Sequence, residues 1–216
     1  MELNNTRARS PEKKQERFQQ IMDVTNQLFL NHSYHDITLT TIAKELNWSR
    51  GNLYKYVNTK EEIFLELYLE KQNQFVEDLK QSFTLQQLDP KTFADKLSTI
   101  FNNNRIYLRY HSILSNIIET NVDVEKLADF KIRSFEQREF IFQLLQVQCP
   151  TFTTKQIKML FLTLMYHACG LDSHTHSTKL LEEAMALANL PLYLDDYCDL
   201  MSEFILMCIE YKNPNS

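Results

Sequence analysis

Six residues that could contact a nucleic acid are concentrated within seven positions of the chain. They are Arg50, Gly51, Asn52, Tyr54, Lys55 and Tyr56. An arginine can donate two hydrogen bonds to O6 and N7 of guanine, and an asparagine can pair in the same way with N6 and N7 of adenine. Tyrosine and lysine can donate to phosphates or bases, and a glycine lets the backbone approach its partner closely. The cluster therefore predicts contact with double-stranded DNA.

The cluster has to be presented by a helix, and the surrounding sequence predicts two short helices joined by a tight turn over residues 38–60. Thr38 and Ser49 are placed to cap them, because a hydroxyl at this position accepts from an unpaired backbone N–H. Asn47 lies at the bend, where a left-handed backbone is often needed and asparagine tolerates it. This geometry is a helix-turn-helix whose second helix enters the major groove. The predicted DNA-binding set is completed by Thr38, Thr40, Ser49 and Lys60.

The stretch from residue 21 to about residue 69 resembles the TetR family of bacterial transcriptional regulators. The segments that carry the resemblance follow one another at the family's spacing: IMDVTNQLF, Tyr34, TLTTIAKEL, SRGNLYKYV and TKEEI. The resemblance implies an N-terminal DNA-binding domain, subunits that pair about a two-fold axis, and a ligand pocket in the C-terminal domain.

Three places in this stretch depart from the family pattern. Asn47-Trp48 stands where the family usually has Gly-Val before the serine of the second helix. Ser33 replaces the usual glycine before the aromatic residue, and Val57 replaces the usual phenylalanine. These are turn and packing positions, so we expect them to affect the choice of operator more than the class of protein.

The composition of the 216-residue chain indicates an all-α protein. Only two glycines and five prolines are present, and residues that favour helices predominate. The net charge of −5 is unevenly distributed. Residues 1–60 hold nine Lys or Arg against six Asp or Glu, whereas residues 61–216 hold fourteen against twenty-two. The candidate DNA-facing part is therefore basic although the whole chain is acidic.

We expect three parts in the chain. Residues 12–58 should form a three-helix, helix-turn-helix DNA-binding domain. Residues 59–83 should form a connecting helix, which opens with a capping box between Thr59 and Glu62. Residues 84–212 should form a larger C-terminal helical domain, to which the resemblance assigns ligand binding and dimerisation.

Helix boundaries within the C-terminal part are indicated by capping and helix-breaking residues. Asp89 is placed to cap one helix, and the triplet 102–104 predicts a break after it. Residues 124–148 predict one uninterrupted long helix. Thr153 is expected to open a further helix, and Gly170 indicates its end.

Aromatic and polar residues on otherwise apolar helices are the candidates for the ligand pocket that the resemblance implies. The set is Phe101, Arg105, Tyr107, Tyr110, His111, Tyr166 and His167. A mostly apolar lining with a few polar groups is typical of small-molecule sites. Core packing is the competing explanation for each residue. Arg105 and Arg109 would favour an anionic group if either faces a cavity.

The resemblance also implies that the last two long helices pair across a two-fold axis as a four-helix bundle. We expect these helices at about residues 155–171 and 194–211. The expected interface residues are Phe161, Met165, Leu200, Phe204, Ile205 and Cys208. A two-fold protein matches a palindromic operator. The alternative is that both apolar faces are buried within one subunit.

Neither a cofactor nor a metal is expected. Free thiols in a reducing cytosol are the simplest reading of Cys149, Cys169, Cys198 and Cys208. No zinc-site spacing relates His167, Cys169, His174 and His176. The N-terminus is polar and charged, unlike a signal peptide, and no apolar run approaches the ~20 residues that span a bilayer. A cytoplasmic protein without membrane contact is expected.

On the strength of the resemblance, the leading hypothesis is a dimeric one-component transcriptional regulator. It would be a repressor that binds a palindromic operator and is released by an unknown small-molecule effector. The alternative among binding proteins is a co-regulator that keeps the helix-turn-helix fold but acts through a protein partner. An all-helical enzyme or metal-binding protein would need converging catalytic or ligating groups, and no such spacing is present in the sequence.

Overall fold

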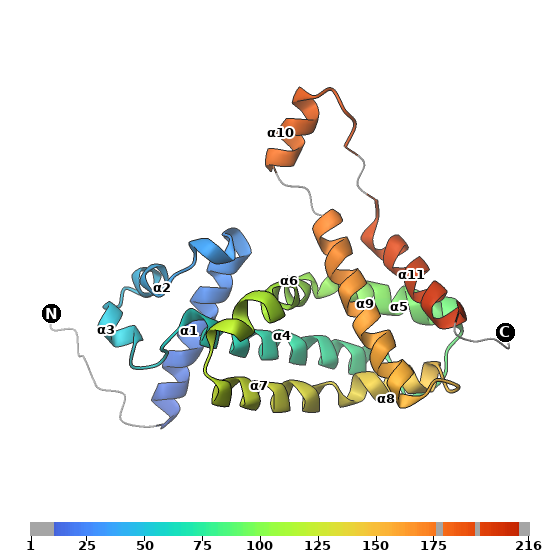
Figure 1. Cartoon of the computed structure of the whole chain (residues 1–216), viewed down its shortest axis with the longest axis horizontal. Helices are drawn as coiled ribbons and strands as arrows, with labels where there is room; N and C mark the ends of the chain where they lie inside the picture. Colours follow the sequence, from blue (N-terminus) through green and yellow to red (C-terminus); the bar gives the residue numbers. More distant parts are fainter. Residues whose placement is uncertain (1–10, 176–178, 193–194, 212–216) are drawn as a thin grey trace. The chain divides into compact units, whose positions relative to one another are not determined.

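The computed structural model describes residues 11–175, 179–192 and 195–211. Every regular element in these ranges is helical, which confirms the predicted all-α fold (Figure 1). The α-helices are α1 (Pro11–Asn31), α2 (Leu39–Glu45), α3 (Arg50–Leu53), α4 (Lys60–Ser82), α5 (Pro90–Asn103), α6 (Arg105–Ile113), α7 (Val124–Gln137), α8 (Glu139–Gln148), α9 (Thr154–His174), α10 (Lys179–Leu187) and α11 (Tyr197–Tyr211). Short helical turns occupy Tyr34–Asp36, Leu114–Ile118 and Glu119–Asn121.

The chain divides into two compact units. The first unit consists of the described residues as far as Leu69 together with Leu114–Phe130. The second consists of Glu70–Ile113 and the described residues from Lys131 onward. Helix α4 is continuous and contributes to both units. Residues 114–130, which the sequence placed in the C-terminal domain, therefore pack as part of the first unit.

The helix-turn-helix of the first unit is formed by α2 and α3. Thr38 Oγ1 accepts from the backbone N–H of Thr41 at 3.1 Å, and Ser49 Oγ accepts from that of Asn52 at 3.2 Å. Each hydroxyl satisfies an N–H that the first turn of a helix leaves unpaired. Asn47 has φ 55°, so the bend is left-handed as predicted. The caps and the turn expected from the sequence are confirmed.

Apolar side chains anchor one side of the helix-turn-helix. Leu53 and Val57 are buried. The ring of Phe64 lies edge-on to those of Phe29 and Tyr34, at centroid distances of 5.2 and 5.1 Å. Because α3 has only one turn and Leu53 fixes its inner side, the remaining positions of that turn face outward.

The start of α4 differs from the predicted capping box. Thr59 Oγ1 accepts from the backbone N–H of Glu62 at 3.3 Å, as expected. The Glu62 carboxylate instead accepts from the N–H of Asn58 at 3.2 Å and pairs with Lys126 Nζ at 2.5 Å. The competing cation comes from α7, which is distant in sequence, so a local pattern could not indicate it. The pair ties α7 to the first turn of α4 within the first unit.

The core of the second unit is built around the part of α4 that lies in it. The ring of Phe75 packs against those of Phe101 and Tyr107, at 5.2 and 5.3 Å between centroids. Gln72 is fully buried beside them, and its Nε2 donates to the backbone carbonyl of Ser134 at 2.8 Å. Its Oε1 accepts from the Ser134 hydroxyl at 3.0 Å. A buried amide with satisfied partners joins α4 to α7.

The expectation of one helix over residues 124–148 is wrong, because the structure ends α7 at Gln137 and begins α8 at Glu139. The carbonyl of Ser134, four residues before Arg138, accepts from Arg138 Nε at 3.0 Å and from the buried Gln72 amide at 2.8 Å. The Arg138 N–H donates to the carbonyl of Phe135 instead, at 3.1 Å. Side-chain donors thus replace the usual backbone donor, and the helix breaks there.

Helix α9 also departs from its predicted end. It continues past Gly170 to His174, and the N–H of Thr175 closes the last turn on the carbonyl of Leu171 at 2.8 Å. Gly170 has no positive φ, so it does not act as a helix terminator here. The capping box of Thr153 is confirmed.

Among the described residues, no helix combines the length and apolarity that a membrane-spanning segment needs.

Candidate functional site

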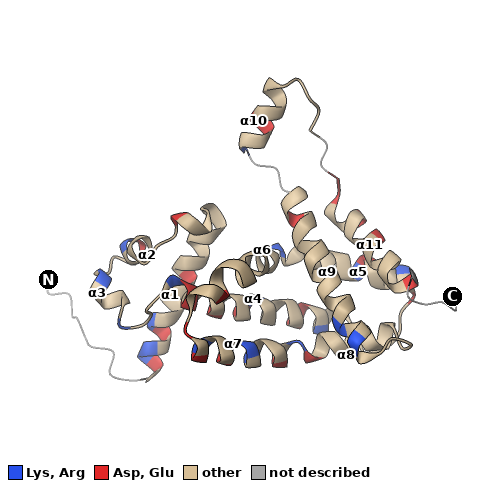
Figure 2. Cartoon of the chain, in the orientation of Figure 1, with Lys and Arg blue, Asp and Glu red and all other residues tan. Residues whose placement is uncertain are grey.

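The outward side of α3 presents the predicted DNA-binding cluster. Arg50, Gly51, Tyr54 and Lys55 are exposed, and Asn52 is half-buried. Figure 2 shows Lys and Arg positions on α1, α2 and α3 of this unit. Arg50 Nη2 donates to the Tyr54 hydroxyl at 3.1 Å, and its Cζ lies 5.5 Å from the centre of that ring. A guanidinium has five N–H donors, so this contact orients Arg50 and still leaves donors for a base edge.

The surface around Gly51 is open. A Cβ placed on Gly51 would meet no heavy atom within 4 Å, so packing inside the protein does not require a glycine there. Beside it, Lys55 Nζ approaches Asn52 Oδ1 at 3.5 Å. The amide of Asn52 and the ammonium of Lys55 therefore lie on one patch with Arg50. The side chains of this patch can donate and accept hydrogen bonds with base edges in one groove of a DNA duplex.

Tyr56 belongs to a second aromatic group in the same unit. Its ring lies 5.7 Å from that of Trp48, and Arg17 Cζ lies 5.4 Å from the centre of the Trp48 ring. An arginine over an indole face is held by a cation–π interaction. Neither Arg17 nor Trp48 was in the predicted set. The unusual tryptophan at the turn, which is half-buried in the structure, was the available signal in the sequence.

Lys60 has intramolecular partners that the sequence did not indicate. Its Nζ donates to the carbonyls of Tyr34 and Ile37, each at 2.8 Å, and lies 3.7 Å from the centre of the Tyr34 ring. Burial lowers the pKa of Lys60, although nearby carboxylates act in the opposite direction. An ammonium has three donors, so a phosphate contact would use the third. Thr38, Thr40 and Ser49 are exposed in this unit.

The predicted ligand residues do not form one site in the second unit. Phe101, Tyr107 and Tyr110 are at most 2% exposed, and the first two pack on Phe75. They fill the interior, which is the core-packing alternative. Tyr166, by contrast, is 65% exposed on the surface of α9. The structure thus places these four residues in two different environments, and their role in ligand binding stays a prediction.

The charge and the N–H donors of the Arg105 guanidinium already have partners within the protein. Its Nη1 lies 3.6 Å from Asp172 Oδ1, its Nη2 donates to Thr175 Oγ1 at 3.1 Å, and its Nε donates to Asn102 Oδ1 at 2.9 Å. Its Cζ lies 4.4 Å from the ring centre of Tyr197. Because the Asp172 carboxylate compensates the guanidinium, the structure does not support an anion-binding role for Arg105.

The two predicted histidines occupy half-buried positions in different surroundings. The ring of His111 lies 6.2 Å from that of Tyr107 and 6.3 Å from that of Tyr166. The ring of His167 stacks on Phe204, with 3.5 Å between centroids and 13° between planes. Burial lowers the pKa of His111 and of His167, so both favour the neutral form. Neither offers a positive charge to a ligand at neutral pH.

The predicted dimer residues divide into inner and outer groups. Phe161, Met165 and Ile205 are at most 3% exposed within a single subunit, so their side chains are not available to a second copy. The outer faces instead carry Met159 and Tyr166 on α9, which are 50% and 65% exposed. On α11 they carry Met207 at 57%, and the half-buried Leu200, Phe204 and Cys208. Periodicity could not separate the two faces because α9 is apolar nearly all round.

No group of three or more His, Cys, Asp or Glu side chains suited to a metal ion occurs among the described residues. His176, one of the metal ligands considered, lies outside the described residues. The four cysteines are free thiols. Burial raises the pKa of Cys149 to about 11 and that of Cys169 to about 12, so these thiols are protonated at neutral pH.

Comparison with protein families covers both units. A family model described as "Bacterial regulatory proteins, tetR family" matches residues 21–67. A second, described as "Tetracyclin repressor-like, C-terminal domain", matches residues 69–210. The chain belongs to the TetR family. The first match contains the helix-turn-helix, and the second spans most of α4 and the helices that follow it, which confirms the resemblance.

Two relatives within the TetR family are named regulators. The chain is 23% identical over 133 residues to the "Fatty acid metabolism regulator protein" of Bacillus subtilis (strain 168), a match that covers 62% of each protein. It is 28% identical over 131 residues to the "HTH-type transcriptional regulator QacR" of Staphylococcus aureus (strain Mu50 / ATCC 700699). That match covers 57% of this chain and 67% of QacR. The chain therefore aligns with about three-fifths to two-thirds of the length of these curated relatives.

Solved structures share the whole fold. The fatty acid degradation regulator FadR from Bacillus halodurans is 16% identical, with a TM-score of 0.54 over 96% of this chain and 99% of that one. A TetR/AcrR-family regulator from Thermobifida fusca YX-ER1 is 17% identical, with a TM-score of 0.52 over 93% of this chain and 99% of that one. At these identities the likeness supports the TetR fold and nothing finer.

Acidification should destabilise this TetR-family protein through His111. Burial first, then the charges of Arg138 and Lys131, lower the pKa of His111 to about 4, whereas an unfolded histidine titrates at about 6.5. The unfolded state therefore gains a proton at a higher pH than the folded state. The free energy of unfolding should fall as the pH drops below 6.5, by about 2 kcal/mol at pH 5.

Urea unfolding at pH 7 and pH 5 checks this prediction. His111→Gln cannot titrate and should remove about 2 kcal/mol of the difference between the two pH values. An unchanged difference in this variant would show that other groups cause the acid sensitivity.

Proposed function

We propose that the protein is a homodimeric one-component transcriptional repressor. The observation that carries this proposal is the exposed patch of Arg50, Asn52, Tyr54 and Lys55 on a capped helix-turn-helix. Each subunit places α3 in a major groove, and two subunits read the half-sites of a palindromic operator about one helical turn apart. The protein acts in the cytoplasm by binding, without catalysis of its own.

Release from DNA is caused by a small molecule in the C-terminal domain. Such a ligand works only to the extent that it binds the DNA-incompetent shape more tightly than the DNA-binding shape. Helix α4 supports this part of the proposal because it is continuous from Lys60, next to the DNA-facing segment, to Ser82 in the second unit. A shift of its C-terminal end is thereby carried to its N-terminal end.

Dimerisation uses the outer faces of α9 and α11. Met159, Tyr166 and Met207 leave these faces apolar and exposed within one subunit. Large apolar side chains gathered on an exposed surface mark protein–protein contacts. Helices α9 and α11 pack on each other within the subunit, so their outer faces can meet the same helices of a second copy (Figure 1).

Fluorescence anisotropy with DNA from upstream of its own gene and neighbouring genes tests the function. Because two relatives are regulators of fatty acid metabolism or degradation, nearby genes of that kind are the first targets to try. Saturable binding that survives excess random DNA at two salt concentrations supports the repressor. Weak binding that disappears at the higher salt favours the co-regulator that acts through a protein partner.

Arg50→Ala should weaken specific binding and relax base preference. Loss of a bidentate contact to guanine costs about 1–3 kcal/mol, while affinity for random DNA should change little. The measurement is anisotropy on the operator and on single-base variants of it. Lys55→Ala is the matched control, because a phosphate contact should weaken both DNAs alike and reduce the salt slope by about 1. Equal affinity of the Arg50→Ala and wild-type proteins would refute the assignment.

Gly51→Ala should separate folding from DNA binding. The added methyl meets no protein atom within 4 Å, and alanine favours a helix over glycine by about 0.5–1 kcal/mol. The free energy of unfolding should therefore rise while operator affinity falls, because the methyl occupies space that DNA would fill. Gly170→Ala, in equally open surroundings, provides the control for stability. Unchanged operator affinity for Gly51→Ala would show that α3 does not approach DNA at this position.

A further inference from the structure

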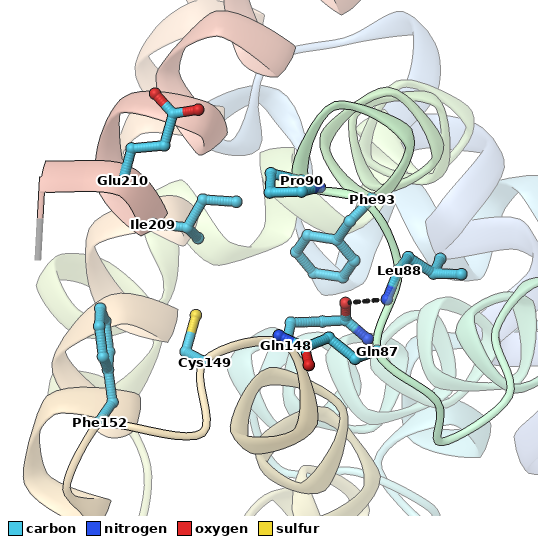
Figure 3. Close-up of a pocket in the computed structure, with 9 residues that line it drawn as sticks. All are labelled: Gln87, Leu88, Pro90, Phe93, Gln148, Cys149, Phe152, Ile209 and Glu210. Carbon is cyan, nitrogen blue, oxygen red and sulfur yellow. Dashed lines mark hydrogen bonds between the residues drawn. The ribbon is translucent and has the colours of Figure 1, made fainter. Parts of the chain in front are cut away.

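A pocket of about 400 Å³ lies in the second unit between α5, α11 and the turn that joins α8 to α9 (Figure 3). Its apolar walls come from Leu88, Pro90, Phe93, Cys149, Phe152 and Ile209. The volume falls within the range of small-molecule sites, about 300–1,000 Å³. The pocket shares no residue with the ligand set predicted from the sequence, whose central aromatics are packed against Phe75.

The polar groups of this pocket are few, and most are already used. Gln148 Oε1 accepts from the N–H of Leu88 at 2.9 Å, and its Nε2 donates to the carbonyl of Gln86 at 2.7 Å. The Cys149 thiol is buried and protonated, because burial raises its pKa to about 11. Gln87 is exposed and offers an amide to an uncharged polar group. The pocket therefore has a mostly apolar lining, with the Gln87 amide as the polar group available to a ligand.

The charge of the described lining disfavours an anionic ligand. Glu210 is the one charged residue among those that line the pocket in the described part of the chain. A carboxylate or phosphate placed here would meet no cation among the described lining residues. Burying a charge without a partner is strongly unfavourable, whereas an apolar molecule gains from leaving water.

We propose that this pocket binds an uncharged, largely apolar small molecule that bears at most one hydroxyl- or carbonyl-type polar group. The apolar part lies against Phe93, Phe152 and Ile209. The polar group lies toward Gln87. The site is distinct from the centre of the unit, where aromatic side chains occupy the space.

The pocket contacts the end of α4 through a short chain of side chains. Phe93 lines the pocket, and its ring lies 5.4 Å from that of Phe83, the residue after α4. Lys96 Nζ donates to the carbonyl of Ser82 at 2.9 Å and lies 5.3 Å from the Phe83 ring. An occupant that displaces Phe93 therefore acts on the last turn of α4. The consequence for DNA, unlike the binding itself, rests on the proposed function.

Protection of Cys149 from alkylation tests the site. In a full-length variant with Cys169→Ser, Cys198→Ser and Cys208→Ser, Cys149 is the remaining thiol. Its rate of reaction with N-ethylmaleimide is measured at mildly alkaline pH, because the thiolate is the reactive form and burial keeps the pKa of Cys149 high. At about ten times its dissociation constant, 1-octanol should slow the reaction about tenfold, because only unoccupied protein reacts. Octanoate at the same concentration has the same chain with a charge and should not protect. Protection by both compounds, or by neither, would overturn the proposal.

A pocket-filling variant gives a second, independent test. Ile209→Trp should abolish 1-octanol binding in equilibrium dialysis, and Leu85→Trp, which adds the same side chain outside this pocket, should not. Binding that survives in Ile209→Trp would overturn the site. If Ile209→Trp does not fold, the alkylation experiment decides alone, since it leaves the apolar walls unchanged.

Operator release separates the site from the proposed function. In anisotropy, 1-octanol should release DNA from the wild type and from Leu85→Trp but not from Ile209→Trp. Protection of Cys149 without release upholds the pocket and refutes its link to DNA binding. Failure to bind any operator refutes the repressor and leaves the protection result as the test of the pocket.

Discussion

Replacing Tyr166 and Met207 together by glutamate should give a monomer that no longer holds its operator. The two side chains are 65% and 57% exposed on the outer faces of α9 and α11. In a two-fold interface each change is present twice, so four carboxylates would have to be buried without designed partners. Loss of the second half-site removes the gain from bivalent binding, about 10²–10⁴-fold in affinity. Light scattering after gel filtration and anisotropy on the operator measure the two effects.

Val124→Glu with Ile132→Glu is the matched control for this prediction. These residues of α7 are 71% and 59% exposed, so the same chemical change is made at equally accessible apolar positions. The control should remain a dimer with unchanged operator affinity. A dimeric Tyr166/Met207 variant would place the interface elsewhere. A monomeric variant that keeps full affinity would contradict the reading of a palindrome by two subunits.

The helix-turn-helix was predictable because its determinants are local. Ser49 caps α3 through an N–H three residues away, and Thr38 caps α2 in the same way. Asn47 supplies the left-handed turn, and the N–H groups of Asn47 and Trp48 donate to carbonyls only three and five residues earlier. One local structure is favoured by the capping residues, by the turn conformation and by the apolar positions Leu53 and Val57. Such consistency makes the structure of a segment predictable from its sequence.

The break between α7 and α8 was not predictable because its cause is distant. The carbonyl of Ser134 accepts from Gln72, which is 62 positions earlier in the chain, as well as from the side chain of Arg138. Over residues 124–148 the helical period continues without a glycine or proline, so local propensity favours one helix. A buried glutamine carries no signal in the sequence that distinguishes it from a solvated one.

The faces of the C-terminal helices were hard to predict for a related reason. In α9, apolar residues occur both inside, as Met165, and outside, as Tyr166. A helix that is apolar all round has no periodic signal to show which side meets the core. The partners of Lys60 were equally hard to predict from the sequence. Its Nζ donates to the carbonyls of Tyr34 and Ile37, which lie more than twenty positions earlier in the chain.

Phe75→Ala should destabilise the protein by about 3–5 kcal/mol, the usual cost of truncating a buried phenylalanine. Phe75 is 1% exposed, and its ring packs against those of Phe101 and Tyr107, two of the residues predicted from the sequence to line a ligand pocket. If those two residues are core residues, removing Phe75 leaves a cavity and costs both transfer and packing energy. Urea unfolding at neutral pH measures the loss.

Phe135→Ala is the control, because it removes the same atoms from a ring that is 53% exposed. It should cost far less, within about 1 kcal/mol, since most of its surface already meets water. The comparison also decides between core packing and a ligand pocket in the centre of the second unit. Side chains that surround a cavity relax into it when one of them is truncated, so a Phe75→Ala cost as small as that of Phe135→Ala would indicate a pre-existing space. A much larger loss for Phe75→Ala than for Phe135→Ala would place the aromatic cluster in the core. The pocket lined by Phe93, Cys149 and Ile209 would then be the site to test for a ligand.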